Sequence, residues 1–191
     1  KHIMPKSILY STSNAEKMRS AQHVCAEYGV VVEQIFVEVD EIQHHDSLKI
    51  AEHKARSVYE ITQQPILVND SSWSKPALGG FPGGYMKDVA AWLSTSDFMN
   101  LIQEKNDKRI ILTDTNSYFD GTTYKEFTAT RYGKFVERPR GISGPSFARV
   151  VVMDGDDKTI SEIFDEPERK GGTSHYDQWC MFLDWFTRGE R

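Results

Sequence analysis

The first third of the chain alternates strand-like runs with segments of helical periodicity, and this order restricts the possible folds more than any other feature. The runs at residues 7–12, 30–39 and 66–68 are apolar and rich in β-branched side chains, as strands are. Between them, apolar residues recur every three or four positions, as on one face of a helix. The run at 66–68 shows no alternation, which is typical of a strand covered on both faces. The chain therefore opens as a β-α-β unit, and we predict an α/β fold.

Capping residues mark where the first two helices begin and end. Asn14 follows the first strand-like run and has the side chain of a good N-cap, and Gly29 can end the helix behind it. Asp46 and Ser47 can cap the second helix, which must stop before Pro65. These local signals agree with the β-α-β order.

The rest of the chain predicts shorter elements around a glycine-rich segment. Residues 77–85 read ALGGFPGGY, which is too short for a linker and too apolar for a simple solvated loop, so its backbone must adopt unusual φ values. The other elements expected from local pattern are helices over 88–93, 96–104 and 174–187, a hairpin over 109–128 that turns at Asp120 and Gly121, and strands over 132–137 and 147–153.

Length and charge limit the classes of protein. With 191 residues and 12% aromatic content the chain can bury one core, and we expect a single two-lobed domain over residues 5–188. The formal charge of -5 argues against a surface that binds nucleic acid. The longest apolar stretch, Val89 to Leu93, is too short to cross a bilayer, so we expect a cytoplasmic protein with no membrane partner.

Cysteine and histidine spacings give no sign of a zinc site. Cys25 and Cys180 each fall in a helix-like segment, and we expect both to be buried free thiols. The sequence has no Cys pair with metal-ligand spacing and no HExxH pattern. It also lacks GxxxxGK[ST] and a GxGxxG after a strand, which excludes P-loop and Rossmann dinucleotide binding at the motif level.

The segment from Thr12 to Lys17 is the first candidate site. Thr12, Ser13 and Asn14 stand at a strand-to-helix junction, where backbone N–H groups and the positive helix end favour an anion. Lys17, one turn into the helix, can reach the same anion. The structural alternative is that Asn14 only caps the helix and Lys17 is solvated.

Carboxylates near strand ends form the second candidate site. Glu38, Asp40 and Glu41 follow the second strand, and Asp70 follows the third. Such oxygen ligands suit Mg²⁺, which tends to use one or two carboxylates together with phosphate oxygens of a substrate. Any one of them can be an ordinary surface acid. Asp70 stands out because it closes an apolar strand, where an acid is unfavourable without a cation or a donor.

The third candidate site precedes the last predicted helix. Lys170 ends a charged cluster and is followed by GGTSH, in which Ser174 can serve as an N-cap. His175 then falls in the first helical turn. We expect this histidine to be a neutral hydrogen-bonding group, because the positive end of the helix disfavours its protonation.

Six segments form one ordered pattern: TSNAEK at 12–17, VDEIQ at 39–43, Lys54-Ala55, PILVNDSSW at 65–73, ALGGFPGGYMK at 77–87 and TSH at 173–175. This pattern resembles the inosine triphosphate pyrophosphatase family and spans nearly the whole chain. Its most specific part is the acidic strand end followed by ALGG-x-PG-x-Y-x-K. Enzymes of that family hydrolyse non-standard purine nucleoside triphosphates, such as ITP, dITP and XTP, to monophosphate and pyrophosphate with Mg²⁺.

The resemblance implies an elongated mixed β-sheet with flanking helices, two lobes around a central nucleotide cleft, and a homodimer. It assigns the triphosphate to Thr12, Ser13, Asn14, Lys17, Lys54 and Lys87, and the base side to Phe147, which stacks on the purine, Lys170, His175 and Tyr176. Glu41 and Asp70 match the magnesium-binding acids. Asp70 also matches the residue that activates water for in-line attack on the α-phosphorus, and Ser71 matches a substrate contact.

Departures from the family pattern gather at the base pocket. Tyr176 stands where the family has Arg, and a phenol donates only one hydrogen bond. The segment 145–148 reads PSFA in place of Phe-Gly-aromatic-Asp. Asn69 replaces a second acid, and Ser72 and Trp73 replace a small apolar pair. Because the phosphate and metal residues match while the base readers change, we expect pyrophosphohydrolysis with a relaxed, shifted or lost base preference.

Two other functions fit parts of the same pattern. One is a pyrophosphatase of the septum-inhibition type, which acts on pyrimidine or modified nucleotides; the purine-stacking position and the Ser-His segment count against it. The other is a nucleotide-binding protein without turnover, suggested by Asn69, Ala148 and Tyr176. The matching acids Glu41 and Asp70 count against this second alternative.

Overall fold

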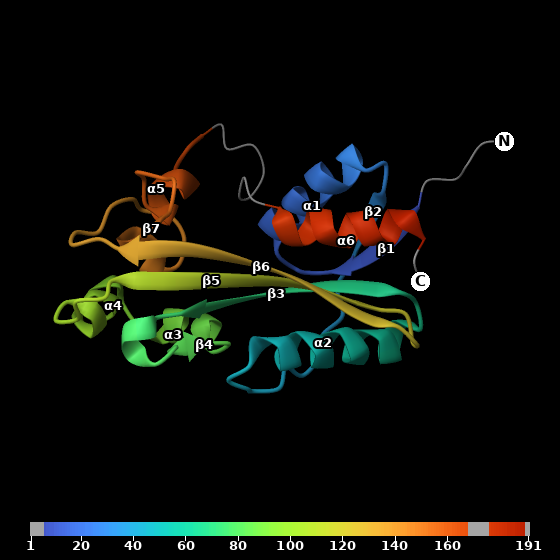
Figure 1. Ribbon diagram of the computed structural model, residues 1–191, viewed down its shortest axis with the longest axis horizontal. Coiled ribbons are helices and arrows are strands. Elements are labelled where there is room, and N and C mark those ends of the chain that lie inside the picture. The colour runs from blue at the N-terminus through green and yellow to red at the C-terminus, as the bar shows by residue number, and fades with distance from the viewer. Residues whose placement is uncertain (1–5, 168–175, 190–191) are drawn as a thin grey trace.

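The computed structural model describes residues 6–167 and 176–189, which form a seven-stranded mixed sheet with helices on both faces (Figure 1). The strands are β1 (Ser7–Ser11), β2 (Val31–Ile35), β3 (Ile66–Ser74), β4 (Pro82–Gly83), β5 (Arg109–Phe119), β6 (Tyr124–Phe135) and β7 (Val151–Met153). The helices are α1 (Ala15–Glu27), α2 (Ser47–Thr62), α3 (Met86–Trp92), α4 (Thr95–Ile102), α5 (Ile160–Phe164) and α6 (Asp177–Arg188), with two short 3-10 helices, η1 (Pro76–Leu78) and η2 (Ser146–Val150).

The sheet combines a parallel part with a longer antiparallel part. Its strand order is β2-β1-β3-β5-β6-β7, with β4 paired to β3. β1 runs parallel to both β2 and β3, whereas β3, β5, β6 and β7 pair antiparallel in succession. The β5–β6 hairpin runs along most of the molecule (Figure 1). This architecture confirms the predicted α/β fold with a mixed sheet.

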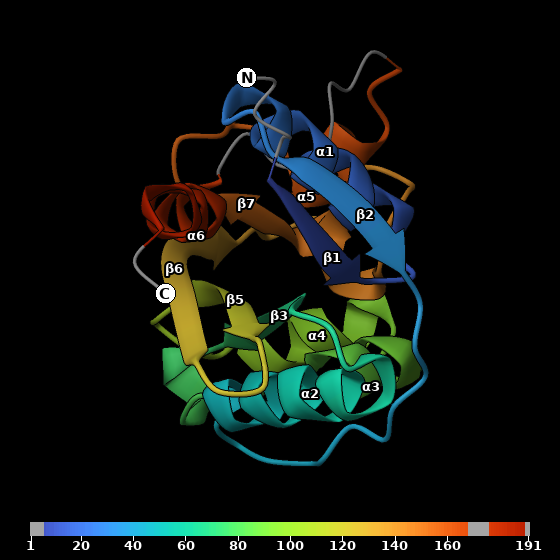
Figure 2. The same ribbon diagram turned by 90° about the vertical axis from the view of Figure 1, so that its right-hand side faces the viewer.

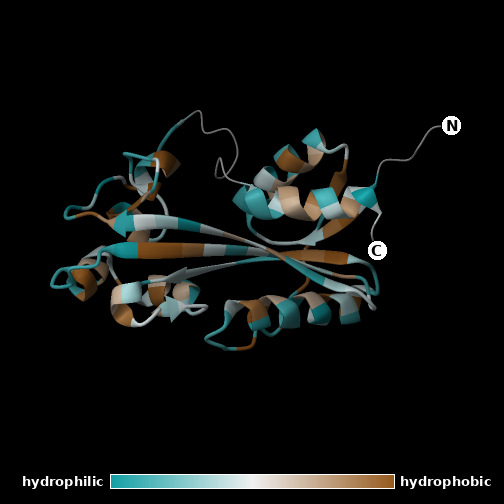
Figure 3. Cartoon of the chain, viewed as in Figure 1, coloured by the Kyte–Doolittle hydropathy of each residue, from teal (hydrophilic) through white to brown (hydrophobic). Residues whose placement is uncertain are grey.

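Two apolar cores cover opposite faces of the sheet at the β1 end. α1 and α6 lie on one face, where Tyr10 packs edge-on against Trp179 and near Phe182. α2 lies on the opposite face (Figure 2), and its Val58 packs with Ile66 of β3. Polar and apolar residues alternate along α2 and α6 (Figure 3), as expected for helices that bury one face.

A third apolar core fills the other end of the sheet. It joins α3, α4 and η2 through buried side chains that include Val89, Phe98, Ile110 and Phe147. The second half of the β5–β6 hairpin thus has its own core, separate from those under α1, α2 and α6. The molecule has two ends with different cores and one sheet that connects them.

The early sequence predictions agree with the structure at the helix starts. Asn14 caps α1 by accepting hydrogen bonds from the backbone N–H groups of Glu16 and Lys17. Asp46 caps α2 in the same way through the Leu48 N–H. Both side chains satisfy backbone donors that have no partner inside the helix.

Three strand predictions were wrong in extent. β2 ends at Ile35, so residues 36–39, expected to belong to this strand, have no strand partner among the described residues. β3 does not stop at residue 68 but continues to Ser74, because β5 supplies ladder partners at all nine positions. The expected strands 109–128 and 132–137 form one hairpin whose second strand ends at Phe135, since β5 pairs with it as far as Lys134.

Two further predictions need correction near the C-terminal half. Phe147 and Ala148 lie in the 3-10 helix η2 rather than in a strand, and only residues 151–153 form β7. α6 begins at Asp177 with Tyr176 at its N-cap. Ser174, the expected cap, lies outside the described residues. α5 was not predicted; its start is fixed by a capping box between Thr159 and Glu162.

The glycine-rich segment 77–85 has the unusual backbone that its composition predicts. Gly79, Gly80 and Gly83 have φ values of 64°, 94° and 60°. A Cβ at Gly84 would lie only 2.6 Å from Cδ1 of Ile50. The segment therefore needs glycine both for conformation and for close approach to α2.

Cys25 and Cys180 are free, as expected, although only Cys25 is fully buried. In the ranges 6–167 and 176–189, no helix has the length and apolarity needed to span a membrane.

Candidate functional site

The junction between β1 and α1 brings the first candidate residues together. Thr12 accepts a hydrogen bond from the Asn14 N–H at 3.1 Å, and Ser13 is exposed beside them. Lys17, one turn along α1, reaches across to β3 and donates to the carbonyl oxygen of Asn69 at 3.4 Å. The structure therefore contradicts the alternative in which Lys17 is simply solvated.

Two carboxylates far apart in sequence meet around one lysine of α2. The Nζ of Lys54 lies 2.9 Å from Oε1 of Glu41 and 3.8 Å from Oδ1 of Asp70. Glu41 lies in the extended segment before α2, whereas Asp70 lies in the middle of β3. Lys87 of α3 is close enough for its charge to lower the pKa of both acids. Glu38 and Asp40, considered with them, are exposed on the segment that carries Glu41.

The pKa shifts show that the site is desolvated and its charges are incompletely balanced. Burial raises the pKa of Asp70, and the charges of Lys54 and Lys17 counteract only part of that effect. Burial likewise lowers the pKa of Lys17 despite the charges of Asp70 and Asp114. Burial opposes the charged form of Lys54 as well, but the charge of Asp70 and the contact with Glu41 prevail and raise the pKa of Lys54. Burial also opposes the charged form of Glu41, but the contact with Lys54 and the charges of Lys87 and Lys17 lower the pKa of Glu41.

The acidic residues fit a divalent cation that also binds a ligand. Oδ2 of Asp70 is buried and has no hydrogen-bond partner within the described residues, so this oxygen is left for a group that the chain does not supply. No cluster of three or more His, Cys, Asp or Glu side chains that could hold a metal ion occurs in ranges 6–167 and 176–189. Two carboxylates completed by phosphate oxygens are, however, the donor set that Mg²⁺ commonly takes.

A cavity of about 380 Å³ begins beside Lys17 and extends over one face of the sheet. Its volume lies in the range of small-ligand sites. The wall is rich in aromatic side chains, and the complete lining is Tyr10, Asn14, Glu16, Lys17, Ser20, Asn69, Ser71, Trp73, Leu112, Asp114, Pro145, Phe147, Ile160, Phe164, Tyr176, Gln178 and Trp179. Both ends of the molecule contribute to this wall, as expected for a central cleft.

The base-side residues lie in this cavity as far as they are described. Phe147 is buried and its ring centroid lies 5.0 Å from that of Trp73. Tyr176 lines the cavity at the start of α6. Lys170 and His175 lie outside the described residues. The cavity therefore joins the phosphate-side candidates Asn14 and Lys17 to these aromatic side chains.

Asp114 is a cavity residue that the sequence analysis missed. It lies on β5 directly opposite Ser71 and accepts a short hydrogen bond from the Ser71 hydroxyl. Burial raises the pKa of Asp114, while Ser71, Lys17 and Arg131 act in the opposite direction. Asp70 stood out as an acid that closes an apolar run, and Asp114 likewise follows the apolar residues Ile110 to Leu112, so the same signal could have found it.

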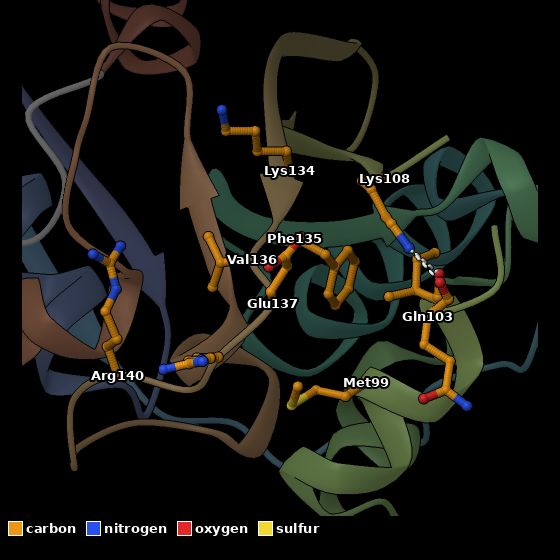
Figure 4. A pocket seen from close by; sticks show the side chains of 10 residues that line it. Met99, Gln103, Lys108, Lys134, Phe135, Val136, Glu137 and Arg140 are labelled. Atoms are coloured by element: carbon orange, nitrogen blue, oxygen red, sulfur yellow. Dashed lines mark hydrogen bonds between the residues drawn. The ribbon is translucent and has the colours of Figure 1, made fainter. Parts of the chain in front are cut away.

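A second cavity, of about 800 Å³, lies at the far end of β6 (Figure 4). Its wall combines Met99 and Phe135 with several basic side chains. One of them, Lys108, donates to the carbonyl oxygens of Ile102 and Gln103 at 2.6 and 2.8 Å and so satisfies the end of α4. None of the predicted site residues lines this cavity, so it is separate from the candidate site.

Comparison with known proteins tests the resemblance noted in the sequence. Residues 8–178 match the model of the Ham1 family. The chain belongs to the Ham1 family. This match covers most of the chain and confirms the predicted relationship.

Curated relatives of this Ham1 protein are named as pyrophosphatases. The chain is 29% identical over 181 residues to the dITP/XTP pyrophosphatase of Methanopyrus kandleri, covering 94% of this chain and 95% of that protein. It is 30% identical over 161 residues to inosine triphosphate pyrophosphatase 1 of Trypanosoma cruzi, covering 83% and 82%.

Solved structures of the Ham1 family share the fold. The HAM1 protein of Coxiella burnetii superposes with a TM-score of 0.79 at 16% identity, covering 96% of this chain and all of that one. The Ham1 protein of Staphylococcus aureus gives 0.75 at 21% identity, covering 97% and 100%. These likenesses confirm the predicted fold class.

Proposed function

We propose that this protein hydrolyses (deoxy)nucleoside triphosphates, in particular non-standard purine ones such as ITP, dITP and XTP, to the monophosphate and pyrophosphate. The observation that carries the proposal is the desolvated Asp70 carboxylate. It lies 3.8 Å from the Lys54 ammonium group, is influenced by the charge of Lys17, and keeps one oxygen free of hydrogen bonds within the described residues. The names of the curated relatives support the same reaction.

The phosphate chain would lie between the start of α1 and the lysines. Thr12, Ser13 and Asn14 offer hydroxyl and amide groups there, and the positive end of α1 favours an anion. Lys17 carries its charge into the same space, and its lowered pKa shows that the charge lacks a sufficient partner. A bound triphosphate would supply that partner and raise the pKa of Lys17 again.

Positive charge from two further lysines, Lys54 and Lys87, would complete the phosphate site. Both act on Asp70 and Glu41, so an incoming phosphate would compete with these acids for the ammonium groups. This competition would free the acids for another cation. The overall charge of the protein is negative, which makes a local group of lysines necessary for an anionic substrate.

Asp70 is assigned as the group that orients the attacking water and accepts its proton. Its raised pKa makes it a better base than an exposed aspartate, which suits proton transfer near neutral pH. Attack in line with the leaving pyrophosphate would then occur at the α-phosphorus. Glu41 and Asp70 would hold Mg²⁺, which when bound offsets charge on the pyrophosphate group.

The cavity beyond Ser71 would take the nucleoside, with Phe147 stacked against the base. Lys170 and His175 are assigned to the base as well, but no contact of theirs is described. Because Tyr176 offers one O–H donor and no charge, we propose that the preference for a 6-oxo purine is relaxed. A homodimer and a cytoplasmic location also stay predictions.

The test is pyrophosphate release with Mg²⁺ from ITP, XTP, GTP, ATP, UTP and dTTP. We expect the wild type to act on purine triphosphates and Asp70→Asn to lose at least about 100-fold in kcat. Asp157→Asn, which changes an exposed turn residue, is the matched control. Activity that survives Asp70→Asn would remove the assigned role, and a preference for UTP or dTTP would favour the pyrimidine alternative. Strong selectivity for ITP and XTP over ATP and GTP would contradict a relaxed base preference.

A further inference from the structure

A polar side chain occupies the buried face of α6 at its first turn. Gln178, Phe182 and Phe186 are spaced four residues apart, so they lie on one face of the helix. Phe182 and Phe186 belong to the apolar core that α6 shares with α1. Gln178 is also buried, with 7% of its surface exposed. An amide at such a position is unfavourable unless it finds a hydrogen-bond partner.

The side chain of Gln178 lines the cavity of about 380 Å³, together with its neighbours Tyr176 and Trp179. Its amide forms no hydrogen bond with another residue in the ranges 6–167 and 176–189. A glutamine amide has two N–H donors and an oxygen that accepts. These groups are therefore available to a molecule in the cavity.

The surroundings of Gln178 favour the base of a nucleotide over its phosphates. The amide is neutral, whereas the phosphate side of the cavity is marked by the ammonium group of Lys17 on α1. Gln178 follows Tyr176 by two residues, and Tyr176 matches a base-side position of the family. The cavity wall also contains the ring pair of Trp73 and Phe147, against which a base can stack.

An amide is complementary to the edge of a purine. A 6-oxo purine presents two acceptors there, O6 and N7, which suit the two N–H donors of an amide. A 6-amino purine presents a donor and an acceptor, the amino group and N7, which suit the amide oxygen and one N–H. The two kinds of purine thus differ in which atoms of the amide they use.

We propose that Gln178 is a specificity-determining residue whose side-chain amide hydrogen-bonds to the 6-position and N7 of a purine in the cavity. This inference rests on the proposed function, because it takes the ligand of the cavity to be a purine nucleotide. The amide can turn by 180° about its terminal torsion, so it discriminates less than the charged arginine that the family has in place of Tyr176. Gln178 therefore gives the relaxed base preference a physical cause.

Substitutions that change the donors and acceptors of residue 178 separate this role from packing. Gln178→Glu keeps the size of the side chain but offers acceptors alone, which suit the amino group of ATP and repel O6 of ITP. Gln178→Lys offers donors alone, which suit O6 and N7 of ITP. A buried donor or acceptor that loses its partner corresponds to a factor of about 10 to 100 in kcat/KM.

The experiment measures the ratio of kcat/KM for ITP to kcat/KM for ATP in the wild type and in both variants. We expect this ratio to fall at least about 10-fold in Gln178→Glu and to rise at least about 10-fold in Gln178→Lys. A new charge also changes the affinity for every triphosphate, but that effect cancels in the ratio. Gln22→Glu and Gln22→Lys, at an exposed position of α1, are the matched controls and should leave the ratio unchanged.

A second readout, calorimetric binding of IMP and AMP without metal, requires no turnover. The ratio of the two affinities should shift in the same opposite directions in Gln178→Glu and Gln178→Lys. This measurement also keeps the inference separate from the proposed function. If the wild type hydrolyses no triphosphate, the proposed function fails. Opposite shifts in IMP and AMP binding would then still support the contact between Gln178 and the base.

Several outcomes would overturn the inference. A ratio of ITP to ATP that stays at the wild-type value in both variants of Gln178 would do so. A shift in the same direction in both variants would also contradict it, since such a shift does not follow the exchange of donors for acceptors. An equal loss of IMP and AMP binding in both variants would mean that the amide contacts the sugar or the phosphate, and the proposal would be wrong.

Discussion

Lys75 offers a test of how charge and burial balance in this fold. Lys75 lies in the chain between β3 and η1, and its side chain is fully buried. Its ammonium nitrogen has no hydrogen-bond partner within the described residues. The nitrogen lies 4.6 Å from the ring centroid of Phe98, 5.1 Å from that of Phe135 and 5.8 Å from that of Phe81. Three aromatic faces thus replace water as the surroundings of a cation.

The magnitude follows from the pKa. Burial lowers the pKa of Lys75 from 10.5 to about 8. A shift of this size corresponds to roughly 3 kcal/mol against the charged form at neutral pH, and attraction to the aromatic rings offsets about 1 to 2 kcal/mol of it. Methionine has a similar volume and carries no charge. We therefore expect Lys75→Met to raise the free energy of unfolding at pH 7 by about 1 to 3 kcal/mol.

The pH dependence of that gain has a definite sign. Between about pH 8 and the ordinary lysine pKa, the unfolded chain keeps the proton of Lys75 and the folded chain has released it. The unfolded state then binds more protons, so this residue makes wild-type stability rise with pH in that window. The advantage of Lys75→Met should accordingly shrink from pH 7 to pH 10.

Urea denaturation at pH 7 and pH 10 measures both effects. At pH 7 the midpoint of Lys75→Met should increase by about 1 M with an unchanged m-value. Lys134→Met, an exposed lysine of β6, is the matched control and should change stability by less than about 0.5 kcal/mol. A destabilised Lys75→Met, or a gain that is the same at pH 7 and pH 10, would refute the reasoning, since either result means that the buried ammonium is not the unfavourable group.

Three further predictions use the same kinds of measurement. Asn14→Ala removes the cap of α1 and should lower the free energy of unfolding by about 1 kcal/mol in urea melts, together with a clear loss of pyrophosphate release. Asn14→Ser should restore both stability and activity. A loss of stability without a loss of activity would mean that Asn14 caps the helix but has no role in the site. Lys54→Ala should raise KM for ITP and lower kcat, while Lys54→Arg should keep part of the wild-type affinity and turnover. An alanine variant with the same kinetics as the wild type would contradict a role of Lys54 in phosphate binding. Gly121→Ala should destabilise the protein by about 2 kcal/mol or more, because Gly121 has a φ of 96° and an added Cβ would overlap the Tyr59 hydroxyl. Thermal melts measure this loss, and a melting temperature equal to that of the wild type would show that the turn relaxes.

The sequence was informative where structure depends on near neighbours. The caps Asn14 and Asp46 act within three residues, and the glycines of segment 77–85 take their φ values from local backbone geometry. The order of motifs along the chain also indicated the family and with it the fold class. These features need no knowledge of which strands pair.

Strand length was not predictable in this way. Asn69 to Ser72 read as the polar end of a strand, yet the ladder continues through them to Ser74 because β5 supplies partners from residues 111–116. Two of the polar side chains form hydrogen bonds across that ladder, where Asn69 donates to Asn116 and Ser71 donates to Asp114. Local polarity therefore predicted a strand end that the pairing overrides.

The sequence by itself determined the β-α-β opening, the caps and the set of charged residues in the candidate site. Only the tertiary structure decided that Asp114 lies beside Ser71 and that Lys54 joins Glu41 to Asp70. The physical reason is that caps and turns are set by hydrogen bonds between neighbouring residues, whereas these contacts depend on strand register and on helix packing between segments far apart in the chain. An acid that follows an apolar run can be noticed from sequence, but the cavity beside it exists only after both ends of the sheet have packed.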